Sequence, residues 1–324
     1  MRAFLFDKRR GDEVESWAES FRALNESQML WLDLTDSTED DENAVFEATG
    51  IARDDALRDF DGAKKPRLKQ QDGYLHVRAV AVSGKETDAS NESVIIDCFV
   101  GTNWIVTVQA AGVAALDDFR EIAVGEGEIG ILDAPSFLSA LLEWVVTSYL
   151  RAFDEIEATL EEFDVEALSS PSNNPDAQIK VLVEGRSRVG RLRRALAPHR
   201  ELFAALSHSE FDPISTEGSA ARFAELTARV DTALASARDA KDGIASSFDV
   251  LIVRTEHRTN EIIKVLTIVS ILLLPGALLA GLAGMNVTLG AHAFVTSPVF
   301  WGVLSAIVLI ALATLALIRS RRWI

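Results

Sequence analysis

The chain has 324 residues, of which 48% are hydrophobic, and it carries 32 basic against 49 acidic side chains, a formal net charge of −17. The acidic balance excludes an ordinary basic nucleic-acid-binding domain, and the apolar content excludes a disordered chain. Because there is one cysteine, no intramolecular disulfide can form, and a lone thiol builds no structural zinc site. We therefore expect a packed protein without a catalytic cofactor and without a nucleic-acid partner.

The first part, residues 1–134, alternates short strand-like and helical patterns, which predicts an α/β arrangement and hence an α+β cytoplasmic domain. Residues 74–82 read as a strand, because β-branched and apolar residues dominate them. Residues 94–108 are predicted as a hairpin that turns at 101–103, with Cys98 in the middle of its first strand. The N-terminal sequence contains no apolar signal-peptide segment, so we expect this part to stay in the cytoplasm.

The second part, residues 135–264, is predicted as a helical stalk. Clusters of proline, serine and asparagine divide it into helices at about 136–168, at about 176–207 and from 216 onward. The third helix meets no proline before Pro275, so it is predicted to continue into the next part as one helix. Such a helix is about 100 Å long, and we expect it to pack against partners.

Apolar and small residues recur along this third helix at three- and four-residue spacing, which predicts a packing seam. The seam comprises Phe223, Leu226, Val230, Ala233, Ala237, Ala240, Ile244, Phe248 and Leu251. We interpret it as the contact surface of a self-associating stalk.

Two charge runs lie on the first two stalk helices. Residues 154–166 contain seven carboxylates, and residues 186–194 contain five arginines. We expect mutual charge pairing across an antiparallel hairpin; the alternatives are cation attraction by the acidic helix and binding of lipid or nucleotide by the arginines. A third run, the acidic residues 39–42, is expected as a solvated loop and not as a metal site.

Charged side chains are absent from the whole stretch between Lys264 and Arg319. Two apolar runs in this third part, residues 265–324, are long enough to cross a bilayer, which predicts transmembrane helices at about 265–286 and 295–318. Basic residues flank both spans on the same side. The positive-inside rule therefore predicts a multi-pass protein of the inner membrane with both termini cytoplasmic.

Small or weakly polar residues follow one face of the first span. This stripe comprises Asn260, Ile263, Thr267, Ser270, Leu274, Ala277 and Gly281. Two spans cannot enclose an aqueous path, so the stripe can line a pore only in an oligomer. The alternative is that these residues serve close packing of helix against helix.

The sequence TNEIIKVLT at 259–267, the mid-span Pro275 and the sequence AGLAGMN at 280–286 resemble the CorA family of divalent-cation transporters. The stretch RLRRALAPHR at 191–200 is similar to the ZntB-like branch of that family. The resemblance implies a funnel-shaped homo-oligomer, a pentamer, in the lipid bilayer. In it the long helix lines the pore and the second span forms an outer ring.

By this resemblance, Gly284, Met285 and Asn286 form the outer entrance and select the ion. Amide oxygens of Asn286 would hold the metal through its hydration water, since Mg²⁺ gives up its water reluctantly. The pore-lining residues would be Asn260, Ile263, Leu266, Thr267, Ser270, Leu274, Ala277 and Gly281. Ile263, Leu266 and Leu274 are expected as apolar constrictions, and the polar members as stations between them.

The sequence departs from the family pattern around the entrance. Aromatic residues are missing at Ala283 and Val287, and the loop 287–292 has no carboxylate, so cations must be attracted by dipoles and carbonyls. We expect Mg²⁺ to be favoured slightly over Zn²⁺, Co²⁺ or Ni²⁺ as the transported ion. The family also implies regulatory Mg²⁺ or Zn²⁺ in the cytoplasm, but no motif identifies its ligands. No catalytic constellation is found, so we expect no enzyme; a non-conducting membrane-anchored scaffold is the other alternative.

Overall fold

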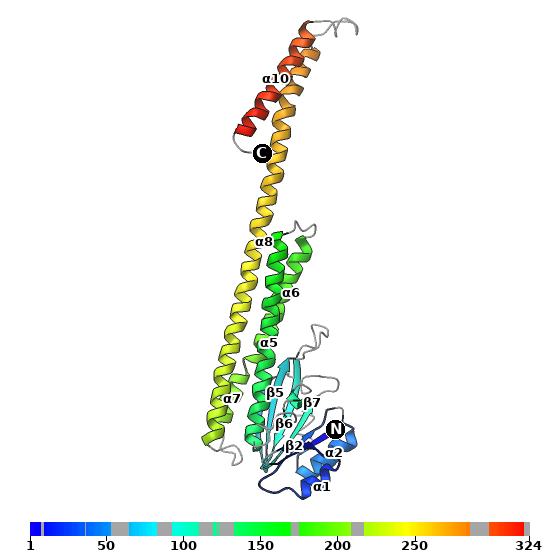
Figure 1. Ribbon diagram of the computed structural model, residues 1–324, viewed down its shortest axis with the longest axis vertical. Coiled ribbons are helices and arrows are strands. Elements are labelled where there is room, and N and C mark those ends of the chain that lie inside the picture. The colour runs from blue at the N-terminus through cyan, green and yellow to red at the C-terminus, as the bar shows by residue number, and fades with distance from the viewer. Residues whose placement is uncertain are drawn as a thin grey trace. The chain divides into compact units, whose positions relative to one another are not determined.

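The computed structural model describes residues 1–7, 10–35, 37–52, 65–82, 93–109, 119–121, 123, 133–169, 175–208, 217–285 and 298–320. The chain divides into two compact units, Met1–Phe248 and Asp249–Ile324, and helix α8 contributes to both (Figure 1). The predicted three-part division at residues 134 and 264 stays a prediction.

The elements follow the chain in this order. The strands are β1 (Arg2–Asp7), β2 (Arg10–Glu13), β3 (Met29–Asp33), β4 (Arg67–Gln71), β5 (Tyr74–Val82), β6 (Ser93–Val100) and β7 (Trp104–Gln109). The helices are α1 (Trp17–Arg22), α2 (Glu39–Thr49), α5 (Ala134–Ser169), α6 (Pro175–Leu196), α7 (His199–Ser207), α8 (Glu217–Met285) and α10 (Pro298–Ser320). The first unit thus combines a sheet with long helices, which confirms the predicted α+β fold class.

The strands described here form one sheet in the order β2-β1-β3-β7-β6-β5-β4, in which β3 and β7 are parallel. The predicted hairpin is confirmed as β6 and β7, and Cys98 is fully buried in the middle of β6. A Cβ on Gly101 would collide with the ring of Trp104, so the turn admits no larger residue at that position.

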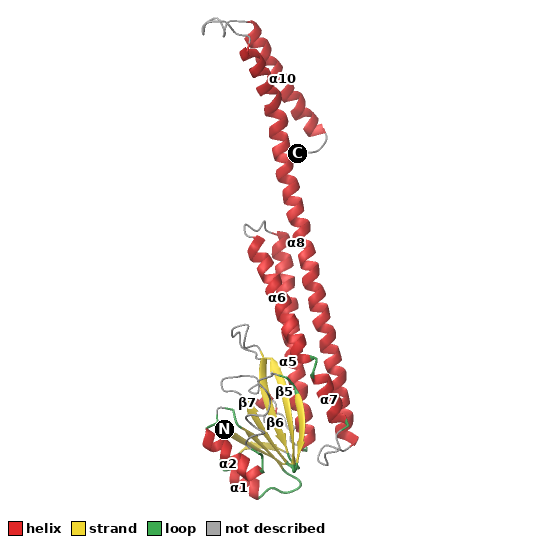
Figure 2. Cartoon of the chain, turned by 180° about the vertical axis from the view of Figure 1, so that it is seen from behind, coloured by secondary structure: helices red, strands yellow, loops and turns green. Residues whose placement is uncertain are grey.

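Helices cover both faces of this sheet (Figure 2). On one face α1 and α2 pack over the core, where the rings of Phe46 and Phe99 are 6.2 Å apart. On the other face Phe137 of α5 lies 5.6 Å from Phe6 and 5.0 Å from Trp31. The buried aromatic rings therefore fix α2 and α5 to opposite sides of the sheet.

The acidic run 39–42 is not the loop that was expected but the first turn of α2. Thr38 caps the helix in a capping box with Asp41, and hydrogen bonds from the hydroxyl and amide of Thr38 lower the pKa of Asp41. Carboxylates are favourable at this end because they face the positive end of the helix dipole. The run therefore serves the helix start.

The pairing of β5 with β4 ends at Arg78. Beyond Arg78, side chains form hydrogen bonds with the backbone groups on that edge of β5. The Val80 amide donates to Nε2 of His199 at 3.1 Å, and the Val80 carbonyl accepts from the Tyr149 hydroxyl at 2.8 Å. These bonds attach α5 and α7 to the sheet, because a buried backbone group without a partner costs about 1–3 kcal/mol.

Complete burial of His199 lowers its pKa from the usual 6.5 to about 4. Nδ1–H donates to the Leu196 carbonyl at 3.1 Å, so Nε2 can accept from Val80 only while the ring is neutral. The stabilisation by neutral His199 is therefore complete above about pH 6.5 and is lost as the pH falls toward the folded pKa of about 4.

The unfolding free energy of the wild-type protein should fall by about 3 kcal/mol between these two pH values, compared with that of the variant His199→Gln, which has no imidazole to protonate. Denaturation of the full chain at several pH values checks this; a pH-independent difference would contradict it.

The predicted helix at 136–168 and the predicted single helix from 216 onward are confirmed as α5 and α8, the latter with 69 residues. The prediction of one helix over 176–207 is wrong, because the chain breaks between α6 and α7. Pro198 stands at the break as the residue before α7. Proline has no amide hydrogen to donate, and its ring clashes with the preceding turn of a helix, so α6 ends before it.

The seam of α8 is covered by helices of the same chain. Its members from Phe223 to Ile244 are buried in the single chain. Leu160 of α5 lies 3.5 Å from the place that a Cβ on Gly243 would take, and Ile244 lies 3.7 Å from the corresponding place at Gly185 on α6. The interpretation of this seam as a self-associating surface is therefore wrong, since periodicity shows that a face is buried but not by which chain.

The two charge runs do meet along α5 and α6. Nη2 of Arg188 lies 3.1 Å from Oε2 of Glu155, which supports mutual charge pairing. Exposed ion pairs also join α8 to its neighbours, Arg229 to Glu143 at 2.9 Å and Arg200 to Asp231 at 3.0 Å. Such exposed pairs contribute little to stability.

Candidate ion pathway

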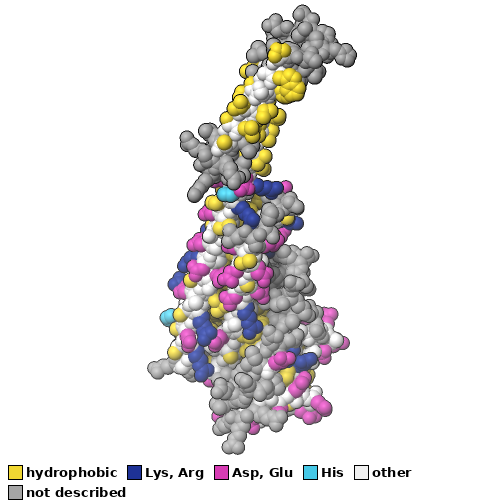
Figure 3. Space-filling model, turned by 45° about the horizontal axis from the view of Figure 1, so that its top comes forward, with side chains coloured by type: hydrophobic (Ala, Val, Ile, Leu, Met, Phe, Trp, Pro, Cys, Tyr) yellow, Lys and Arg dark blue, Asp and Glu magenta, His cyan; other side chains and the backbone are white. Residues whose placement is uncertain are grey.

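Within the part of the chain that the structure describes, one helix is long and apolar enough to cross a membrane. It is the segment Gly218–Leu278 of α8, with a mean hydropathy of 2.0 in its most apolar window. Helix α10 holds a shorter apolar stretch, Leu304–Thr314. Figure 3 shows hydrophobic side chains over the apolar end of α8, whereas charged side chains cover the helices of the first unit.

Helix α10 packs on one face of the apolar half of α8. A Cβ on Gly276 would lie 3.5 Å from Cγ2 of Ile307, so the missing side chain lets the helices approach. Pro275 is half-buried beside this contact. Because α-helical residues are about 100° apart, Leu274 points about 200° away from Gly276, to the face that α10 leaves open.

The predicted stripe lies on that open face. Asn260, Thr267, Leu274 and Gly281 recur at heptad spacing, as do Ile263, Ser270 and Ala277 between them, so they form one line along the helix. Leu274 is 72% exposed and Ile263 53%, while Thr267 is half-buried. Leu266, 64% exposed, lies beside the line and not on it. Their role as a pore lining stays a prediction.

The two hydroxyls of the stripe are turned into acceptors by the helix itself. Oγ1 of Thr267 donates to the Ile263 carbonyl at 2.7 Å, and Oγ of Ser270 donates to the Leu266 carbonyl at 2.8 Å. Each hydroxyl has one proton and two lone pairs, so the lone pairs remain for an outside donor. Water molecules around a cation turn their hydrogens outward, and such oxygens match them.

The predicted selectivity motif begins in the last turn of α8, which ends at Met285 after Gly284. Asn286 lies outside the described residues. The last four carbonyls of a helix have no partner within it, and the helix dipole makes this end negative. The position of the motif therefore favours a cation even though the following loop has no carboxylate.

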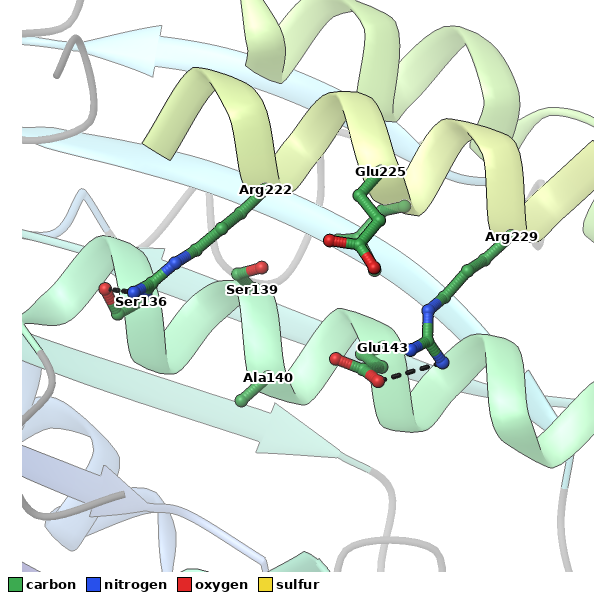
Figure 4. Close-up of a pocket in the computed structure, with 8 residues that line it drawn as sticks. Ser136, Ser139, Ala140, Glu143, Arg222, Glu225 and Arg229 are labelled. Atoms are coloured by element: carbon green, nitrogen blue, oxygen red, sulfur yellow. Dashed lines mark hydrogen bonds and ion pairs between the residues drawn. The ribbon is translucent and has the colours of Figure 1, made fainter. Parts of the chain in front are cut away.

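A second polar site, between α5 and α8, was missed by the sequence analysis because its residues are distant along the chain (Figure 4). It is a cavity of about 250 Å³ lined by Ser136, Ser139, Ala140, Glu143, Arg222, Glu225, Leu226 and Arg229. Arg229 pairs with Glu143, and Arg222 donates to the Ser136 hydroxyl. Two arginines and two glutamates balance, so this cavity has no excess charge for an ion.

No group of three or more His, Cys, Asp or Glu side chains is placed to hold a metal among the residues that the structure describes. The regulatory site implied by the resemblance therefore has no ligand set in the described part of one chain. In the described part of the chain, the feature that could contact a cation is the open stripe of α8, together with the C-terminal end of that helix.

A mixed α+β unit joined by one long helix to an apolar segment is the fold of a membrane transporter of the CorA type. It matches the complete structure of the CorA magnesium transporter from Methanocaldococcus jannaschii with a TM-score of 0.76 and 17% identity, over 100% of this chain and 99% of that one. It also matches the ZntB cytoplasmic domain from Vibrio parahaemolyticus, with a TM-score of 0.59 and 15% identity, over 79% and 98% of the two chains.

The family described as CorA-like Mg²⁺ transporter protein matches residues 26–321, and the chain belongs to this family. The cobalt/magnesium transport protein CorA of Methanocaldococcus jannaschii is 22% identical over 311 residues, 93% of either chain. The protein of the same name from Thermotoga maritima is 22% identical over 227 residues, 69% of this chain and 63% of the relative. The match therefore spans less than two thirds of the Thermotoga protein.

Proposed function

We propose that the protein is a divalent-cation channel or transporter of the inner membrane, built as a homopentamer with both termini in the cytoplasm. The observation that carries this proposal is the stripe of α8, which stays open opposite α10 and leads to Gly284-Met285 at a helix end. Copies that turn this stripe toward a common axis would enclose an aqueous path. Family membership supports the assignment.

A hydrated cation would enter at Gly284, Met285 and Asn286. Asn286 would offer amide oxygens to the water shell, and the free carbonyls of the helix end would add negative potential. A ring of acceptors that bonds to hydration water binds Mg²⁺ without removing that water. Selection then depends on the size of the hydrated ion.

Along the pore, oxygen-bearing and apolar levels would alternate. Asn260, Thr267 and Ser270 would supply acceptors, while Ile263 and Leu274 would form narrow apolar levels. The described stripe contains no thiol, imidazole or carboxylate. Zn²⁺ prefers nitrogen and sulfur ligands, whereas Mg²⁺ prefers oxygen, so the stripe favours Mg²⁺; Zn²⁺, Co²⁺ and Ni²⁺ are the alternatives.

Flux into liposomes tests this function. Purified protein should admit Mg²⁺ down its gradient, and Asn286→Ala should lower the rate about tenfold, the effect of ~1.4 kcal/mol on a barrier. Asn43→Ala on α2 serves as the matched control, since its amide is far from the motif in sequence, and it should transport as wild type. Parallel gradients of Zn²⁺, Co²⁺ and Ni²⁺ rank the ions.

An absence of flux under every cation gradient would instead favour a membrane-anchored scaffold. Unchanged flux in Asn286→Ala would show that the Asn286 amides do not control transport, while the proposal of a cation channel would remain.

A further inference from the structure

The charged residues that border the apolar segment lie at one level of the α8–α10 pair. Gly276 and Ile307 mark where the two antiparallel helices touch. Lys264 precedes Gly276 by the same interval of sequence at which Arg319 follows Ile307. At about 1.5 Å of rise for each position, both are about 18 Å from the contact and in the same direction from it. The end of α10 thus brings Arg319 to the level of Lys264.

Arg258 extends this level on α8. Along the helix axis it lies about 9 Å before Lys264. Arg258 and Gly276 are separated by about five whole helical turns, so both are on the α10 side of the helix and away from the stripe. We call Arg258, Lys264 and Arg319 the basic collar.

The position of the basic collar corresponds to a lipid headgroup layer, an argument that rests on the proposed membrane placement. No charged residue occurs between Lys264 and Arg319, so the collar begins where the apolar segment ends. The headgroup region of a bilayer is about 5–8 Å deep on each side. Lysine and arginine side chains bury their stems and extend their charge into this layer, which places Arg258 within reach.

One carboxylate lies within the collar. Glu261 is between Arg258 and Lys264 in sequence, and its Oε1 is 4.0 Å from Nδ1 of His257. Both side chains of that pair are largely exposed, at 67% and 76%, so water screens the carboxylate. By formal charge, Arg258, Lys264 and Arg319 are three cations against the one anion Glu261.

The opposite end of the apolar segment offers no competing charge, because residues 265–318 contain no charged side chain. A preference for charged lipid at the borders of this segment must therefore arise at the end that carries the collar, in one leaflet. We propose that the basic collar binds the phosphate of anionic phospholipids in the leaflet on the cytoplasmic side. Arginine suits this partner because its guanidinium bonds phosphate oxygens in pairs.

Lipid selectivity of the full-length protein in phosphatidylcholine vesicles tests the proposal. Spin-labelled phosphatidylglycerol and spin-labelled phosphatidylcholine are compared by the fraction that the protein immobilises. Wild type should favour phosphatidylglycerol, and Arg258→Gln should weaken its association about fivefold, the effect of one basic side chain at a membrane surface. The triple variant with Lys264→Gln and Arg319→Gln should show no preference. Equal immobilisation of the two lipids by wild type would overturn the proposal.

Two further variants keep the result interpretable if the triple variant fails to fold. Lys241→Gln, at an exposed lysine of the same helix well before the collar, is the matched control and should keep the wild-type preference. Glu261→Gln removes the opposing carboxylate and should strengthen the preference. A loss of preference in Lys241→Gln, or a weaker preference in Glu261→Gln, would contradict the collar.

The source of the phosphate and the link to transport are separated by two more measurements. Inorganic phosphate should displace labelled phosphatidylglycerol no better than sodium chloride of equal ionic strength. Stronger displacement by inorganic phosphate would show that the collar binds a soluble phosphate compound, and it would overturn the proposal that the collar binds a phospholipid. Cation flux is recorded on the same vesicles, so that a channel without lipid preference is distinguished from a protein that does not conduct.

Discussion

Replacing Leu274 with asparagine is expected to raise Mg²⁺ flux into liposomes about tenfold, as ~1.4 kcal/mol off the barrier would do. Leu274 is 72% exposed on the face of α8 that α10 leaves open. In an oligomer whose stripes face one axis, several copies of this side chain would form an apolar level that excludes water. An amide at that level would keep it hydrated, so a cation could pass with its water shell.

Leu273→Asn is the matched control for this change. Leu273 is 66% exposed, and it points about 100° away from Leu274 on the same helix. An asparagine there should leave flux unchanged while its polar group disfavours contact with lipid. Flux is followed with a Mg²⁺-sensitive dye inside the liposomes. If both variants raised flux equally, a general leak and not an apolar level at Leu274 would be responsible.

Replacing Asp33 with alanine is expected to lower the free energy of unfolding by about 3–5 kcal/mol, the typical cost of removing one partner of a buried ion pair. Asp33 is 1% exposed at the end of β3, and its Oδ2 lies 2.5 Å from Nη2 of Arg120. Its Oδ1 accepts from the Thr35 hydroxyl at 2.6 Å. The variant leaves a buried guanidinium without this carboxylate and leaves the hydroxyl without its acceptor.

Denaturant titration of the full chain in detergent measures this loss. Asp72→Ala, at an exposed position between β4 and β5, is the control and should change stability by no more than about 0.5 kcal/mol. A double variant that adds Arg120→Leu should recover part of the loss, because it removes the buried guanidinium that has lost this carboxylate. A loss below about 1 kcal/mol in Asp33→Ala would show that the pair is not buried as described.

Local periodicity carried the fold predictions that are confirmed. The hairpin of β6 and β7 follows from alternating apolar residues around a short turn, and the 69-residue α8 follows from a helical pattern without an interrupting proline. The break at Pro198 does not follow from the helical pattern, because helical residues flank it on both sides. The pattern of the α8 seam predicts a buried face but does not identify what covers it. In the structure, α5 and α6 of the same chain cover this face.

The candidate site was predictable as a line of residues but not as a pathway. Spacing placed Asn260 to Gly281 on one face, and the structure leaves that face open. A pore needs several copies, so one chain can define only the exposed line and the helix end at Met285. The cavity between α5 and α8 could not be found from sequence, because Ser136 and Arg222 are 86 positions apart and meet only through folding.

Pro275 creates a point in α8 at which the helix can bend more easily than elsewhere. It lies inside the helix, and because proline has no amide hydrogen, the carbonyl of Ile271 one turn earlier loses its usual donor. Bending is cheapest where such a bond is missing. Bending at Pro275 would tilt Gly281 and Gly284 while Asn260 and Thr267 kept their places. The proposed outer entrance could then widen or narrow independently of the proposed polar levels at Asn260 and Thr267.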